Sequence, residues 1–120
     1  GAIRFKGNRV NCSTGANQLI VYNIANIYEP YIVSFKNLSN PKGLALDGKW
    51  LFVCDQNITM FDRSTISNLV VHKKTATLAA NDCIAGHNLL TVSADDGIYQ
   101  YDYANGNLNF LSKIAKVQPL

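Results

Sequence analysis

The sequence predicts an all-β protein of the β-propeller type, with three four-stranded antiparallel blades. A pattern recurs about every 40 residues, short apolar segments alternate with polar turns, and no segment has a helical periodicity. The repeat is visible in three stretches, which read NQLIVYNI at 17–24, NITMFDR at 57–63 and GIYQYDY at 97–103. In each stretch, apolar residues lead to an aromatic residue that is followed by Asn or Asp.

The landmarks of this repeat keep a nearly constant spacing. The polar residues after the aromatics are 39 and 40 residues apart, and they are Asn23, Asp62 and Asp102. The upstream glycines are 41 and 38 residues apart, and they are Gly7, Gly48 and Gly86. We therefore expect a single propeller segment over residues 1–120, with blades at approximately 2–37, 42–77 and 82–114.

Each repeat divides into four short strands at its turn residues. Gly, Asn and Asp mark these turns because they tolerate the backbone angles that tight turns need. The first repeat predicts strands at 2–6, 9–13, 18–24 and 31–36. The second predicts strands at 43–47, 49–55, 58–63 and 69–73. The third predicts strands at 83–85, 89–94, 98–103 and 109–113.

Several strands are apolar on both faces, which is expected where sheets stack face to face. Leu51, Phe52, Val53 and Cys54 are consecutive, for example. Propellers have four to eight blades, so three blades predict either a longer chain or self-association through the end blades. We expect the uncovered faces of the first and third blades to include Val10, Ile20, Val21, Leu90, Val92, Tyr99 and Tyr101.

The second and third repeats resemble the LVIVD-repeat family of β-propellers. The resemblance is carried by PKGLALDGKWLFVCDQNITMFDRS at 41–64 and AGHNLLTVSADDGIYQYDYANGN at 85–107. The first repeat departs from the family pattern, with Asn11 inside its second strand and Asn23 in place of Asp. The resemblance implies a bacterial extracytoplasmic or cell-surface protein, often a lipoprotein, with more blades than three and no settled activity.

Composition and charge exclude several classes of function. The net charge is +3, and only Lys73 and Lys74 are adjacent cations, so the sequence carries no nucleic-acid-binding footprint. No apolar run is long enough to predict a transmembrane span.

The three cysteines predict neither a metal site nor a required disulfide. Cys12, Cys54 and Cys83 have no CxxC spacing, and neither His72 nor His87 lies near them in a metal-binding pattern. We expect their places in different strands and blades to hold their Cα atoms too far apart for a disulfide, and we interpret the three cysteines as small buried apolar residues. We therefore expect no metal and no cofactor.

Candidate ligand-binding residues lie in turns. Asp55, Asp95 and Asp96 are expected between the second and third strands of their blades, where acidic turns could hold a ligand or Ca²⁺, or serve only as turn residues. Trp50, beside a turn, is the remaining candidate.

Other repeated or aromatic residues are interpreted as structural. Asp62 and Asp102 recur once per blade, so we expect their carboxylates to accept backbone N–H groups in the following turn, and Gly7, Gly48 and Gly86 to form turns. Tyr99, Tyr101 and Tyr103 share one strand face, where they either pack between blades or stack on a sugar.

No catalytic residues emerge from the sequence, which lacks a GxSxG nucleophile elbow. The leading hypothesis is a non-catalytic binding or scaffolding propeller with a protein or carbohydrate ligand. The alternative is a segment of a hydrolase or lyase acting on extracellular carbohydrate, with polar residues such as Lys42 and Asp82 at the propeller axis. A third possibility is a purely structural segment that supports another domain.

Overall fold

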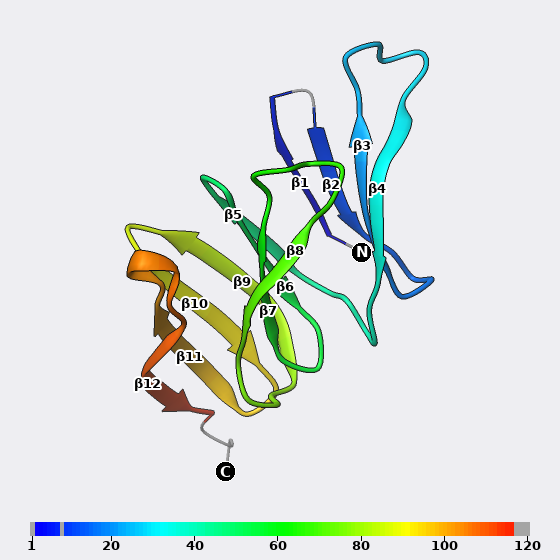
Figure 1. Ribbon diagram of the computed structural model, residues 1–120. Helices are drawn as coiled ribbons and strands as arrows, with labels where there is room; N and C mark the ends of the chain where they lie inside the picture. The colour runs from blue at the N-terminus through cyan, green and yellow to red at the C-terminus, as the bar shows by residue number, and fades with distance from the viewer. Residues whose placement is uncertain (1, 8, 117–120) are drawn as a thin grey trace.

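The computed structural model describes residues 2–7 and 9–116, which form twelve β-strands and one short 3₁₀ turn (Figure 1). Blade 1 contains β1 (Ile3–Lys6), β2 (Arg9–Ser13), β3 (Gln18–Asn23) and β4 (Tyr31–Asn37). Blade 2 contains β5 (Leu44–Asp47), β6 (Trp50–Cys54), β7 (Ile58–Asp62) and β8 (Val70–Lys74). Blade 3 contains β9 (Ala80–Gly86), β10 (Leu89–Ala94), β11 (Gly97–Asp102), the 3₁₀ turn η1 (Ala104–Gly106) and β12 (Asn109–Ala115). The predicted fold class is confirmed.

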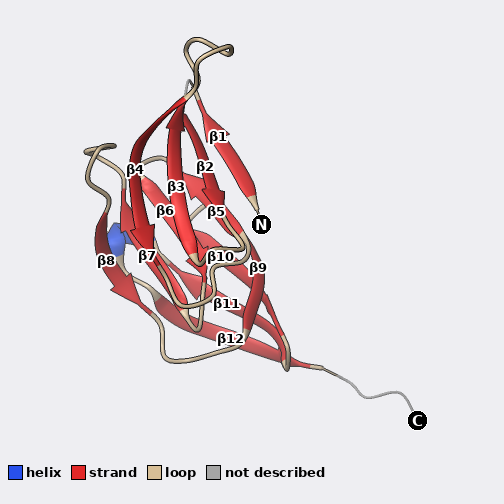
Figure 2. Ribbon diagram, turned by 90° about the vertical axis from the view of Figure 1, so that its right-hand side faces the viewer, coloured by secondary structure: helices blue, strands red, loops and turns tan. Residues whose placement is uncertain are grey.

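Each blade is an antiparallel meander in which every strand pairs with the next one along the chain. The three sheets lie side by side with blade 2 in the middle, as two views at right angles show (Figures 1 and 2). The first strands of the blades approach one another, since β5 lies against both β1 and β9. Arg4 Nη2 of β1 also lies 3.9 Å from Asp82 Oδ1 of β9, so blades 1 and 3 meet beside the first strand of blade 2.

The strand bounds differ most from expectation in the third blade. β9 begins at Ala80 rather than at Cys83, because the polar residues Asn81 and Asp82 continue the strand. The turn after β9 is formed by His87 and Asn88, whose φ angles are +53° and +62°. Gly86 is the last residue of β9 and lies outside the left-handed region, so this turn does not depend on its being glycine, whereas Gly7 and Gly48 both have φ +57°.

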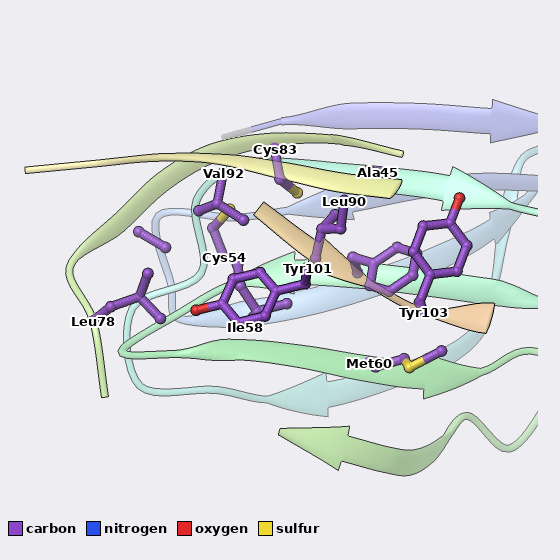
Figure 3. Close-up of a cluster of buried hydrophobic side chains, with 12 residues drawn as sticks. Ala45, Cys54, Ile58, Met60, Leu78, Cys83, Leu90, Val92, Tyr101 and Tyr103 are labelled. Carbon is purple, nitrogen blue, oxygen red and sulfur yellow. The ribbon is translucent and has the colours of Figure 1, made fainter. Parts of the chain in front are cut away.

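Two apolar layers hold the blades together. The layer between blades 1 and 2 contains Leu19, Val21, Leu44, Leu51, Val53, Phe61 and Leu69. The layer between blades 2 and 3 is larger, and Figure 3 shows its side chains converging from both sheets. It includes Phe52, Ile58, Met60, Leu90, Val92, Tyr101 and Tyr103. Blade 2 therefore buries both of its faces, as its continuous apolar strands predict.

The outer faces of the end blades are not the ones expected from the sequence. Val21, Leu90, Val92 and Tyr101 face blade 2, and the half-buried Tyr99 packs against the same layer as Tyr101. Among the expected residues whose side chains are described, only Ile20 lies on an outer face. It points away from the layer between blades 1 and 2, because its neighbour on β3, Val21, points into that layer. The side chain of Val10 lies outside the described part of the structure.

The outer face of blade 1 is instead formed by the neighbours of Ile20 across the sheet. Backbone pairing places Phe35 opposite Ile20, and Ile32 opposite Tyr22. Ile3 and Phe5, from β1, are 62% and 73% exposed. This face is apolar across three strands of the sheet.

Candidate functional site

Two of the predicted acidic ligands hold the connections between blades. Asp55 accepts hydrogen bonds from the backbone N–H groups of Ser39, at 3.3 Å, and of Asn40. In the next blade, Asp95 Oδ1 accepts from Asn81 Nδ2 at 2.8 Å. Asn40 and Asn81 lie in equivalent positions just before, or at the start of, the first strand of a blade. Each carboxylate therefore fixes the entry of the chain into the blade to which that carboxylate belongs.

Asp96 is engaged within its own blade. Its Oδ2 lies 2.7 Å from Lys113 Nζ and 2.9 Å from the hydroxyl of Tyr99. These hydrogen bonds, the one from Lys113 above all, lower the pKa of the Asp96 carboxyl. No group of three or more side chains that could hold a metal ion occurs within residues 2–7 and 9–116.

Trp50 lies at the opposite rim of blade 2 from Asp55, because the two residues flank β6 at its two ends. Its ring is 4.7 Å from that of His72, and Lys49 Nζ lies 4.7 Å from its centre on a face. His72 Nε2 in turn lies 2.8 Å from the carbonyl oxygen of Gly106 in blade 3. Trp50 thus belongs to a contact between blades, and the structure does not bring it together with the three aspartates.

The residue at the end of each third strand forms the same turn in all three blades. Asn23, Asp62 and Asp102 each accept a hydrogen bond at 2.8 Å from the backbone N–H two residues later. Such Asx turns end a strand by giving the backbone a side-chain partner. At Asp62, hydrogen bonds from Ser64 lower the pKa of the carboxyl.

A polar hollow lies where the first strands begin. It has a volume of about 420 Å³, and its lining includes Arg4, Lys42, Asn81 and Asp82. Lys42 and Asp82 are the residues that the enzyme alternative places at the axis. However, Asp82 accepts from the backbone N–H of Cys83, and Lys42 Nζ bonds to Asn81 Oδ1 at 3.0 Å. The described lining contains one carboxylate, whereas glycoside hydrolysis commonly needs two, so the enzyme alternative gains no support here.

An aromatic groove lies between the outer strands of blades 2 and 3. Its volume is about 330 Å³, and its lining includes Leu78, Tyr99, Tyr101, Leu108 and Phe110, with Lys74 also contributing. The Phe110 ring meets Tyr99 and Tyr101 edge-on, with centroids 6.3 and 6.0 Å apart. We define these residues as the aromatic groove.

Sequence reasoning identified only part of the aromatic groove. The alternation of Tyr99, Tyr101 and Tyr103 was the available signal. Tyr103 proves to be buried between blades, where its hydroxyl donates to Asp47 Oδ2. Phe110 completes the groove from β12, and nothing in the sequence around it predicts that it lines a groove.

Two of the cysteines are closer together than expected. Cys54 and Cys83 are both buried in the layer between blades 2 and 3 (Figure 3), and both are free thiols. A hydrogen bond with Cys83, together with burial, raises the pKa of the Cys54 thiol. Their strands therefore bring the two thiols into one buried layer, which the sequence did not predict, and no disulfide joins them. The side chain of Cys12 lies outside the described part of the structure.

Comparison with known proteins shows the fold but no family. No family model matches the chain, and no curated protein matches it. The structure is similar to the solved N-terminal domain of Nup159, with a TM-score of 0.64 and 17% identity over 96% of this chain and 30% of that chain. The same values hold for a solved complex in which S. cerevisiae Dbp5 is bound to Nup159, Gle1, IP6 and ADP.

Kluyveromyces lactis Hsv2 is also similar, with a TM-score of 0.63 and 12% identity over 90% of this chain and 33% of that chain. The chain thus spans about a third of the length of these proteins. The likeness shows a β-propeller-like fold. Within the described residues, no helix has the length and apolar character needed to cross a membrane.

Proposed function

We propose that this chain is part of a non-catalytic β-propeller that binds protein, and that the aromatic groove receives an apolar side chain of the partner. The observation that carries the proposal is the exposure of Phe110, which is 58% accessible although it contacts two tyrosines. Aromatic residues in a concave, apolar site are typical anchors of protein recognition.

The charges around the aromatic groove favour an acidic partner segment. Lys74 contributes to the lining, and Lys73 precedes it on the fully exposed strand β8. On the blade 3 side, the carboxylate of Asp96, which accepts from the groove residue Tyr99, is already paired with Lys113. A peptide with a large apolar residue flanked by Asp or Glu would therefore match both the shape and the charge of the groove. The complex of Nup159 with Dbp5 is a precedent for a similar fold in contact with protein.

A phage-displayed library of random peptides, panned against the wild-type protein, tests this proposal. We expect enriched peptides that are acidic and apolar, and whose binding falls at least tenfold with Phe110→Ala. Leu111→Ala is the matched control, because Leu111 is the adjacent residue, is 54% exposed and does not line the groove. Enriched peptides that bind both variants equally would contradict the groove as the interface. Binding of neutral glycans that depends on Phe110 would instead indicate a carbohydrate ligand.

The apolar outer face of blade 1 supports a second part of the proposal: another propeller blade covers it, from a second copy or from further chain. The matched proteins are about three times longer than this chain, and a propeller ring closes with four to eight blades. Burial of several hundred Å² at about 25 cal/mol per Å² would contribute several kcal/mol. Sedimentation of the 120 residues should show association that Phe5→Lys or Phe35→Lys abolishes. A monomeric wild-type protein at micromolar concentration would rule out self-association.

The resemblance to LVIVD-repeat proteins supports a narrower proposal, that the protein works outside the bacterial cytoplasm. This proposal rests on the residues at 41–64 and 85–107 alone. Fractionation of cells that express the complete gene product tests it. Recovery of the protein in the cytoplasmic fraction would contradict it.

A further inference from the structure

The contact between blades 1 and 2 is apolar along one half and cationic along the other. Backbone pairing places Arg9 opposite Asn23, and Asn11 opposite Val21. Directly paired residues share a sheet face, and Val21 faces blade 2. Arg9 and Asn11 therefore point toward blade 2 as well, at the end of the contact where Asp62 ends β7 and Arg63 follows it.

Three buried polar atoms lack a hydrogen-bond partner in the described structure, and all three belong to this half of the contact. They are Arg9 Nε, Asn11 Oδ1 and Arg63 Nε. Buried polar groups are nearly always satisfied, so a cluster of exceptions needs an explanation. Both arginines are only half-buried overall, so part of each side chain is open to solvent.

The two arginines also lack a counter-charge. Among the described ion pairs, none includes Arg9 or Arg63. Burial and the charge of Arg9 lower the pKa of Arg63. Two of the three arginines in the chain thus belong to the same half of this contact, and neither takes part in a described ion pair.

One lysine flanks the arginine pair. Lys6, which pairs with Arg9 across the sheet, donates from its Nζ to the carbonyl oxygen of Gly48 in blade 2 at 3.2 Å. The side chain of Lys49 instead lies over the Trp50 ring. The carboxylates on this rim are engaged, since Asp62 bonds Ser64 and lies 4.0 Å from Lys49, and Asp47 accepts from Tyr103.

We propose that Arg9 and Arg63 form an oxyanion site between blades 1 and 2 that binds a phosphate group. Guanidinium groups match the geometry of phosphate oxygens and donate two parallel hydrogen bonds to them. Three cationic side chains, those of Arg9, Arg63 and Lys6, favour a doubly charged phosphate over a singly charged carboxylate, because each further charge adds to the attraction. This site lies on a different contact from the aromatic groove, and it stands whether or not the groove binds protein.

Thermal unfolding with increasing inorganic phosphate tests the site, with sodium chloride adjusted to keep the ionic strength constant. A ligand that binds only the folded state raises the unfolding temperature as its concentration rises. We expect phosphate to raise the midpoint of the wild-type protein, and acetate at equal ionic strength to raise it less. No shift with phosphate, or an equal shift with acetate, would overturn the proposal.

Four variants separate binding from folding. Arg9→Gln and Arg63→Gln should weaken phosphate binding at least tenfold, yet should not lower the midpoint in phosphate-free buffer, because each relieves the repulsion. Arg63→Lys keeps the charge but loses the paired hydrogen-bond donors of the guanidinium group, so it should give an intermediate affinity for phosphate. Lys116→Gln removes one charge from an exposed residue just after β12 and should leave the phosphate response unchanged. If Lys116→Gln weakens the response as much as Arg63→Gln, the effect is one of net charge and no specific site exists.

Discussion

Replacement of Gly43 by alanine should destabilise the protein because β5 and β9 approach too closely for a side chain there. A Cβ at Gly43 would lie 2.6 Å from Asp82 Cα and 2.9 Å from the carbonyl oxygen of Asn81, and it would also meet Asp82 Oδ1. Two of these three atoms belong to the backbone, so rotation of a side chain cannot relieve the clash. The backbones must separate.

The cost of that separation can be estimated from the bonds that it strains. Gly43 N–H donates to the Asn81 carbonyl oxygen at 3.0 Å, and the Gly43 carbonyl oxygen accepts from Cys54 N–H at 2.9 Å. Overpacking of a tight site costs about 1–3 kcal/mol, and loss of one hydrogen bond adds about 1 kcal/mol. We therefore expect Gly43→Ala to lower the free energy of unfolding by about 2–4 kcal/mol.

Urea denaturation measures this loss as a lower midpoint at unchanged slope. Gly86→Ala is the matched control, because a Cβ there would have no neighbour within 4 Å and the residue has no left-handed φ. It should change stability by no more than about 0.5 kcal/mol. Equal stability of the two variants would refute the close approach of β5 and β9 described here.

Three further predictions concern single side chains. Because the pKa of Asp62 is lowered, its contribution to stability is complete above about pH 4 and is lost below it. Asp62→Asn should keep the turn, as Asn23 does, and should reduce the fall of the unfolding temperature at acid pH in thermal melts. An unchanged fall would contradict this role of Asp62. Tyr103→Phe should cost about 1–3 kcal/mol in urea, because Asp47 loses its donor. Burial raises the pKa of Tyr103, so the stability that its neutral phenol contributes should fade as the pH rises above about 10. If Tyr103→Phe has the same free energy of unfolding as the wild-type protein, the hydrogen bond is unimportant. The raised pKa of the Cys54 thiol should keep it unreactive toward thiol reagents at neutral pH until the protein unfolds, and native labelling at the rate of a small free thiol would argue against that.

The strand pattern could be predicted because its signals are local. β2 and β10 have the bounds that their flanking turn residues indicate, and the Asp62 and Asp102 turns follow from a side chain and a backbone group only two residues apart. The facing of side chains could not be predicted so well. Consecutive apolar residues such as those of β3 remove the alternation that distinguishes one sheet face from the other.

The candidate sites depend on contacts between blades, which local sequence does not encode. The aromatic groove brings Phe110 beside Tyr99 across a hairpin and sets both near the connection from blade 2. Arg9 and Arg63 are 54 residues apart in sequence, and each is unremarkable where it stands. Asp55 and Asp95 show the opposite problem. They were predicted as ligands, but in sequence an aspartate that stabilises a turn looks the same as one that binds a ligand.

One irregularity recurs in the pairing of the third and fourth strands of every blade. The register shifts between Val21 and Tyr22, between Met60 and Phe61, and between Gln100 and Tyr101. The extra residue of each bulge lies in the fourth strand, so that strand bends, twists more strongly and loses its regular row of backbone donors and acceptors. The fourth strands β4, β8 and β12 form the outer edges of the sheets, where an uninterrupted row would template growth by foreign chains. The repeated bulge thus protects each blade against amyloid-like edge pairing. Deletion of the extra residue, such as Leu111 in β12, would restore regular pairing and should promote fibril formation before it harms the fold.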